Sequence, residues 1–215
     1  MASYGQLIAD VKAWLKRQDI DAQIPSWVLQ CETDIAESLR ARPMIVRGTQ
    51  AVDANFIMLP PDFIRFESVA TSCCGRLLSL EDHWTGPYPS DNGGCCDYGD
   101  AVSGYRLVGN CIEFLPHPVF PDPPDPSWSP TIVNVAWYAK PTPLVNPADT
   151  NVVLENFYSI YLFGVVRYGA MWGLDDDREK QMTTRFAEAV AVANRWMEDS
   201  SYSGAPLRAS LATVF

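Results

Sequence analysis

Residues 151–196 show the most distinctive pattern of apolar and polar positions in the chain. The first part, Asn151–Trp172, is apolar on nearly every face, and the second, which ends near Trp196, is apolar on one face. A charged turn at 175–180 separates them. A helix that is apolar all round has to be covered on all sides. The pattern therefore predicts a helical hairpin that other elements or neighbouring copies cover.

A second helical hairpin is predicted at residues 1–42. Ser3 and Gln6 have the spacing of a capping box, and apolar residues then recur at helical spacing until the helix stops near Arg17. Pro25 suits the first turn of the next helix, where an amide hydrogen would have no partner. Pro43 ends the hairpin. The apolar face of this next helix consists of Val28, Cys31, Ile35 and Leu39.

Residues 43–145 are predicted to form short strands and turns. Gly109–Asn110 lies between two strand-like segments and is a turn pair that tolerates positive φ, so a β-hairpin is expected there. Another hairpin turn is expected at 72–75, and 131–138 is the strongest strand pattern. Irregular loops are expected at 91–100 and 121–130.

The last helix is predicted to begin at Asp176, where Glu179 completes a capping box. The helical pattern stops after Asp199. Residues 200–215 lack periodicity, so we expect an extended arm that is disordered when alone. The stripe of the last helix that is expected to be buried consists of Met182, Phe186, Ala189, Val190, Ala193 and Met197.

These patterns together predict an α+β fold. The helical hairpins at 1–42 and 146–199 are expected to cover each other as a four-helix bundle. The β-rich region 43–145 is inserted between them, and 200–215 follow as an extended C-terminal arm.

The composition is that of a globular protein and not of a disordered one. The chain has 215 residues, of which 47% are hydrophobic and 20% charged, and its net charge is −10. The net charge argues against tight binding of nucleic-acid phosphates, which requires clustered Lys and Arg, but it does not exclude a protein that surrounds DNA without binding it tightly. The N-terminus lacks the pattern of a signal peptide, and the most apolar segment, 157–172, is too short and interrupted for a membrane span.

Cysteine chemistry stays open at this point. Because no export signal is expected, reduced thiols are the default, and disulfides between vicinal cysteines or a metal site are the alternatives. Adjacent cysteines suit zinc poorly, since neighbouring side chains of an extended chain point in opposite directions. No cofactor and no metal are predicted. The cysteines are Cys31, Cys73, Cys74, Cys95, Cys96 and Cys111.

No arrangement of catalytic residues is apparent in the sequence, and an enzyme is not expected. His83 and His117 are the only histidines, and His117 lies between two prolines, outside any nucleophile motif. The acidic run 175–177 is interpreted as a solvated turn at the positive end of the last helix. The aromatic residues of 157–172 are predicted to lie in the core or at a subunit interface. Those where we expect contact with the next subunit are Tyr158, Tyr161 and Tyr168.

The order of these elements resembles that of the head-to-tail adaptor (connector) proteins of short-tailed bacteriophages. The resemblance spans nearly the whole chain, and the chain departs from it in the cysteine-containing loop 91–100 and in the proline-rich loop 121–130. It rests on the opening segment 4–8 with Trp14–Leu15, on 24–27, 59–63 and 104–116, on Tyr138 with 141–144, and on the hairpin 151–196 with its acidic turn.

The resemblance implies a structural protein of the virion that is assembled in the host cytoplasm. Such adaptors form a ring, commonly of twelve copies, beneath the portal protein, extend the DNA channel and attach the tail nozzle. In the family the C-terminal arm docks on the portal. In this chain the arm's anchors are Leu207, Arg208, Leu211, Val214 and Phe215.

Three other interpretations remain alongside the adaptor. The first is another phage ring or tail-completion protein, the second is a cell-wall glycosidase that uses two carboxylates, and the third is a metal-stabilised binding module.

Overall fold

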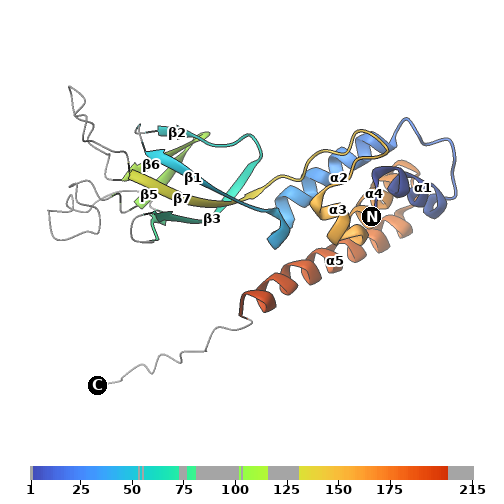
Figure 1. Ribbon diagram of the computed structural model, residues 1–215. Coiled ribbons are helices and arrows are strands. Elements are labelled where there is room, and N and C mark those ends of the chain that lie inside the picture. The colour runs from blue at the N-terminus through green and yellow to red at the C-terminus, as the bar shows by residue number, and fades with distance from the viewer. Residues whose placement is uncertain are drawn as a thin grey trace, which may run out of the picture. The chain divides into compact units, whose positions relative to one another are not determined.

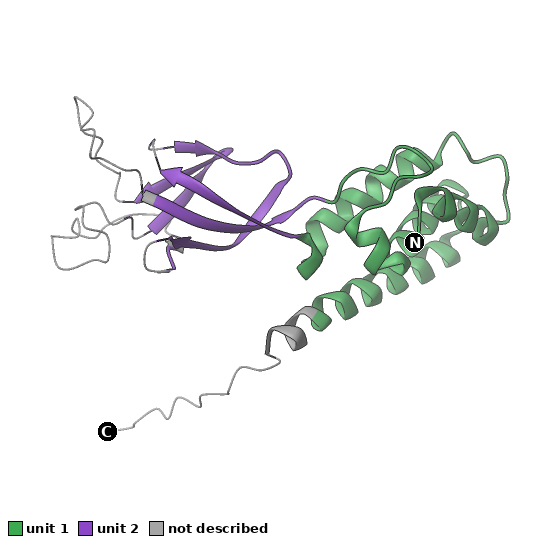
Figure 2. Cartoon of the chain, viewed as in Figure 1, with its two compact units in different colours: residues 1–44, 141–215 green, residues 45–140 purple. Residues whose placement is uncertain are grey.

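The computed structural model divides the chain into two compact units (Figure 2). Unit 1 comprises residues 1–44 and 141–215, and unit 2 comprises residues 45–140. The expected boundaries, 42/43 and 145/146, lie within a few residues of these. The structure describes residues 2–52, 54, 56–72, 77–80, 102, 104–115 and 131–202.

Unit 1 is helical in its described part (Figure 1). Helix α4 packs against α1, α2, α3 and α5, so the most apolar helix of the chain is the one with the most neighbours. No helix among the described residues is both long and apolar enough to cross a membrane. The elements are α1 (Tyr4–Leu15), α2 (Ile24–Ser38), a 3₁₀ helix η1 (Arg42–Met44), α3 (Val152–Asn156), α4 (Tyr158–Trp172) and α5 (Asp176–Tyr202).

Unit 2 contains two small sheets, and with unit 1 it confirms the α+β class. One sheet has the order β1-β7-β3 and is antiparallel; the other has the order β2-β6-β5-β4, in which only β4 and β5 run parallel. The strands are β1 (Ile45–Val52), β2 (Phe56–Met58), β3 (Phe63–Thr71), β4 (Ser79–Leu80), β5 (Gly104–Val108), β6 (Cys111–Leu115) and β7 (Thr131–Ala139).

Both sheets contribute side chains to one apolar core. Phe66 of β3 and Tyr105 of β5 meet edge to face, with ring centroids 5.4 Å apart, which joins the two sheets. Phe114 is fully buried at the centre. Glu113 of β6 is also buried and forms an ion pair with Arg106 of β5. The buried core residues are Val52, Leu59, Val69, Leu78, Val102, Tyr105, Ile112, Phe114 and Val133.

Several local predictions are confirmed. The Ser3 hydroxyl accepts a hydrogen bond from the Gln6 amide at 3.3 Å and caps α1. Gly109 has φ +60° in the turn between β5 and β6, and 131–138 lie in the central strand β7. An antiparallel bridge between Ala70 and Leu77 flanks the predicted turn at 72–75, of which 73–75 lie outside the described residues. The predicted loops at 91–100 and 121–130 also lie outside them.

Two predicted helix ends are wrong, and one helix predicted as continuous is broken. Helix α2 ends at Ser38, before the expected residue 42. The helix expected to run on from Asn151 is broken at Phe157. The Asn156 side-chain amide donates a hydrogen bond to the Val152 carbonyl, which competes with the helix backbone, and the Phe157 ring packs edge to face on Trp196.

The last helix begins at Asp176 as predicted, but its capping residue and its end differ from the prediction. Asp175, and not Asp176, provides the cap, since its carboxylate accepts a hydrogen bond from the Arg178 amide at 3.1 Å. Helix α5 then continues to Tyr202, past the expected end at Asp199. The predicted buried stripe is confirmed for Met182, Phe186, Val190 and Ala193; Ala189 is half-buried, and the Met197 side chain is outside the description.

Candidate interaction surface

Two glycines allow other helices to approach α4 closely. A Cβ atom added at Gly164 would lie 2.4 Å from the Cys31 sulfur of α2 and 3.2 Å from the Phe186 ring of α5. A Cβ atom added at Gly169 would lie 2.5 Å from Leu15 of α1. Glycine lowers helix stability, and here it is present because the close packing of three helices around α4 requires it.

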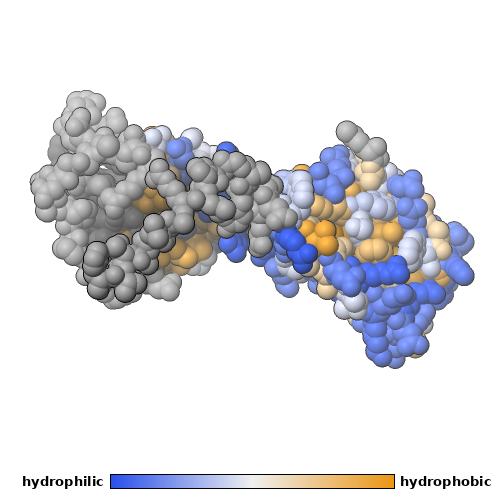
Figure 3. Space-filling view, turned by 90° about the horizontal axis from the view of Figure 1, so that it is seen from below, coloured by the Kyte–Doolittle hydropathy of each residue, from blue (hydrophilic) through white to orange (hydrophobic). Residues whose placement is uncertain are grey.

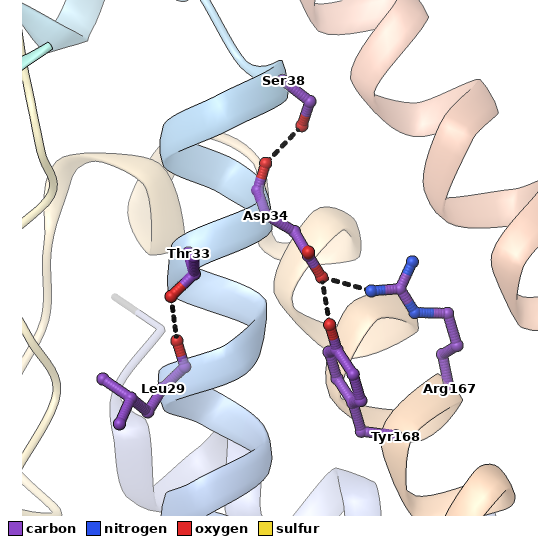
Figure 4. A network of polar contacts seen from close by, with 6 residues as sticks. All are labelled: Leu29, Thr33, Asp34, Ser38, Arg167 and Tyr168. Carbon is purple, nitrogen blue, oxygen red and sulfur yellow. Dashed lines mark hydrogen bonds and ion pairs between the residues drawn. The ribbon is translucent and has the colours of Figure 1, made fainter.

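A charged cluster joins α2 to α4 (Figure 4). The Asp34 carboxylate forms an ion pair with Arg167 and accepts a hydrogen bond from the Tyr168 hydroxyl at 2.6 Å. The Arg167 guanidinium also lies 4.9 Å from the centre of the Phe186 ring. Burial and the hydrogen bond to Asp34 raise the pKa of Tyr168 to about 12, so this tyrosine stays protonated and donates to Asp34.

A second polar cluster ties α2 and α4 to the segment that leads into α3. Glu32 accepts a hydrogen bond from the Leu144 amide at 3.1 Å and lies within 3.4 Å of the Tyr161 hydroxyl. Asn151 caps α3 through the Leu154 amide and donates to the Tyr161 hydroxyl at 2.8 Å. Burial raises the pKa of the Glu32 carboxyl above its ordinary value.

The three tyrosines predicted at a subunit interface differ in exposure. Tyr161 is fully buried among residues of its own chain, so it has no surface to offer another subunit. Tyr158 and Tyr168 are half-buried, and Tyr158 donates a hydrogen bond to Asp10 of α1. The predicted arm anchors Leu207, Arg208, Leu211, Val214 and Phe215 lie outside the described residues.

An open apolar groove runs between the first turns of α4 and the middle of α5. Its volume is about 1040 Å³. Val192 and Trp196 of α5 are 63% and 55% exposed beside it, which is unusual for adjacent large apolar side chains. Figure 3 shows apolar patches among hydrophilic residues on the helical unit. This α4–α5 groove is lined by Asn156, Phe157, Tyr158, Ser159, Ile160, Phe163, Arg185, Glu188, Ala189, Val192, Ala193 and Trp196.

Sequence reasoning missed most of this groove. Tyr158 is the one lining residue that the sequence singled out as a contact. Val192 and Trp196 lie outside the buried stripe of α5, and large apolar residues outside the buried stripe of an amphipathic helix are the signal that could have identified them.

At one side of the groove, the Arg185 guanidinium lies 5.8 Å from the centre of the Phe163 ring.

The described residues offer no cluster of side chains for a metal ion. Cys31 and Cys111 are free thiols, and burial raises the pKa of the Cys31 thiol. The four vicinal cysteines, Cys73–Cys74 and Cys95–Cys96, lie outside the described part, as do both histidines. The alternatives of disulfides or a metal among those residues therefore stay untested.

The predicted acidic turn is found at the surface between α4 and α5. Leu174 has φ +56° and is 87% exposed, and Asp176 and Asp177 are exposed. Asp175 is engaged as the helix cap and forms an ion pair with Arg178 at 3.4 Å. Carboxylates in these positions stabilise the start of a helix, which accounts for all three without a catalytic role.

Comparison of the whole sequence with the profiles of known protein families gives a match. The profile of the SU10 adaptor protein family matches residues 2–210, nearly the whole chain. The chain belongs to the SU10 adaptor protein family. This confirms the resemblance to head-to-tail adaptors of phages. No curated protein matches the chain. For this adaptor, the groove and the aromatic residues around it are the candidate surface for binding other proteins.

Proposed function

We propose that this adaptor is a structural protein of a phage particle that forms a ring beneath the portal, continues the DNA channel and attaches the tail. The observation that carries the proposal is the family match over residues 2–210. By analogy with the family, the ring has about twelve copies related by cyclic symmetry.

Within the ring, unit 1 provides the scaffold. We infer that α1, α2, α4 and α5 act as one four-helix bundle, which the contacts of α4 with the other three support. Unit 2 is then the insertion available to a tail protein, such as the nozzle. Half-buried Tyr158 and Tyr168 keep their proposed place at the contact with the next subunit, and buried Tyr161 does not.

The C-terminal arm, 200–215, is proposed to dock on the portal. Leu207, Leu211, Val214 and Phe215 supply apolar anchors, and Arg208 is the only charged side chain of the arm. A segment that orders on its partner loses conformational entropy there, so its apolar contacts have to outweigh that cost.

DNA passes through the ring without specific binding in this proposal. The net charge of −10 opposes tight binding to phosphates, because affinity for DNA depends on clustered cations. Exposed acids such as Asp176 and Asp177 contribute to that repulsion wherever they face the channel.

Mixing the adaptor with the purified portal of the same phage tests the proposal. The full chain is expected to form a symmetric ring on the portal, visible by electron microscopy. A chain that ends at Tyr202 keeps the whole of α5 and is expected to fold but not to assemble. Rings of the truncated chain on the portal would contradict the role of the arm, and failure of the full chain to bind portal would contradict the adaptor proposal.

The glycosidase alternative has a separate test. Asp175–Asp177 lie in a surface turn and Asp175 is a helix cap, so no cleavage of peptidoglycan by the purified protein is expected. Cleavage that is lost in an Asp176→Asn variant would favour the enzyme instead.

A further inference from the structure

The end of the α4–α5 groove nearest the C-terminus is formed by exposed apolar side chains. Trp196 stands edge to face on Phe157, with ring centroids 6.3 Å apart, and Val192 lies one turn earlier on α5. Both are more than half exposed. Such a patch is costly to leave in water, so it marks a docking site for an apolar segment.

The chain itself carries a segment of matching pattern directly after α5. Leu207, Leu211, Val214 and Phe215 are spaced as i, i+4, i+7 and i+8, the spacing of one face of a helix. The last nine residues thus have a helical period that 200–215 as a whole lacks. Ser203–Pro206 precede them and contain Gly204 and Pro206, residues suited to a chain reversal before a new helix.

The distances allow this segment to reach the groove of its own chain. Trp196 lies six residues before Tyr202, about 9 Å along the helix axis. Residues 207–215 as a helix are about 13 Å long, so after a reversal they extend past Trp196 to about the level of Ala193. A helix of that length is therefore long enough to reach the exposed end of the groove.

Charges at the groove also match those of the arm. Glu188 and Arg185 line it, and neither takes part in an ion pair among the described residues. The arm brings one cation, Arg208, which is opposite in charge to Glu188 of the groove. Opposite charges at the edge of an apolar contact fix its orientation more than its strength.

We propose that residues 207–215 dock as a short amphipathic helix in the α4–α5 groove of their own chain and leave it when a partner captures them. The tether of Ser203–Pro206 gives an effective concentration on the order of millimolar, so an affinity of only ~0.1 mM keeps the arm docked about nine-tenths of the time. A docked arm shields the apolar surface of the free protein. Its release to the portal, which rests on the proposed function, uncovers the groove at the moment when ring neighbours arrive.

Hydrogen exchange of the full-length free protein tests the docking. Amides of 208–215 and of 190–196 are expected to exchange more slowly in the wild type than in Leu211→Asp, by about tenfold in the arm. Ala209→Asp is the matched control, because position 209 lies on the opposite face of the proposed helix and should leave the protection unchanged.

A second pair of variants tests the groove itself. Val192→Asp places a charge in the groove at an exposed position and is expected to release the arm, whereas Ala191→Asp, exposed and outside the groove, is not. Rapid exchange of 208–215 in the wild type would overturn the proposal. Protection that rises with protein concentration would overturn it too, since it would assign the groove to a second copy.

This test contains no portal, so its outcome is independent of the adaptor function. Loss of portal binding with a protected arm would leave the docking intact. Portal binding with an unprotected arm would refute the docking alone.

Discussion

Each of the two units of this adaptor is stabilised internally by a different set of contacts. Unit 2 has a core of apolar side chains shared by two sheets, and backbone ladders fix the position of each strand. Unit 1 adds two polar clusters, around Asp34 and Glu32, and close contacts at Gly164 and Gly169. It also leaves an apolar groove open on its surface.

The two units need different contacts because strands and helices differ in how much of their packing geometry the backbone hydrogen bonds fix. Strand partners are fixed through their backbones, so the order of the strands does not depend on polar side chains, even though Glu113 and Arg106 of unit 2 form an ion pair. A helix satisfies its own backbone, so its angle and position against other helices depend on side chains. Polar clusters at the α2–α4 contact supply that specificity, at the cost of removing charges from water.

The largest effect is expected from Phe114→Ala in unit 2. Removal of a fully buried ring leaves a cavity and should lower the free energy of unfolding by about 4 kcal/mol. Hydrogen exchange should show the loss in 45–140, with little change in α1, α2 and α4. Leu107→Ala, at a position of β5 that is 42% exposed, is the control and should cost much less. An equal loss in both units would contradict an effect confined to the core of unit 2.

Asp34→Ala is expected to lower the stability of unit 1, measured by the same unfolding and hydrogen-exchange experiments. The substitution leaves the mostly buried Arg167 without its carboxylate and removes the acceptor of Tyr168, so the loss of stability should be about 3 kcal/mol. Asp176→Ala in the exposed turn serves as the matched control. A loss below that of the control would show that apolar packing alone positions α4.

A smaller effect is expected at the acidic turn, where the three aspartates are not equivalent. Asp175→Ala removes the cap of α5 and should cost about 1 kcal/mol in chemical denaturation. Asp177→Ala should change stability by only a few tenths, because it affects the helix dipole alone. Equal losses would show that charge, and not the hydrogen bond of the cap, is what the turn contributes.

The smallest effect is a pH dependence at Glu32. Its pKa is raised in the folded state, so its contribution to stability is full below its ordinary pKa of about 4.3 and is lost as the pH rises through the raised value. Glu32→Gln keeps an acceptor for the Leu144 amide but does not titrate. The stability of the variant relative to wild type should therefore increase from about pH 4 to about pH 7. A constant difference would contradict burial as the cause.

Local features of the fold could be predicted where a few neighbouring residues decide them. Ser3 with Gln6 predicted the start of α1, and Gly109–Asn110 predicted the hairpin between β5 and β6. The sheet orders could not be predicted, because pairs such as β1 with β7 join residues far apart in the sequence.

The candidate surface was predictable only in part. Spacing identifies the aromatic residues of α4 but not which of them its neighbours bury. It therefore predicts a subunit contact for Tyr161, which hydrogen bonds with Glu32 and Asn151 hold inside the fold. The break at Phe157 was missed for a similar reason. Its contact with Trp196, a residue of another helix, competes with local helix propensity.

The close approach at Gly164 turns Cys31 into a chemical reporter. The Cys31 thiol of α2 is fully buried against Gly164 of α4, so alkylating reagents reach it only when these helices separate. Burial also raises its pKa, so little reactive thiolate forms in the closed state. The rate of Cys31 labelling, read by mass spectrometry at that one residue, therefore measures how often unit 1 opens, without a probe having to be introduced.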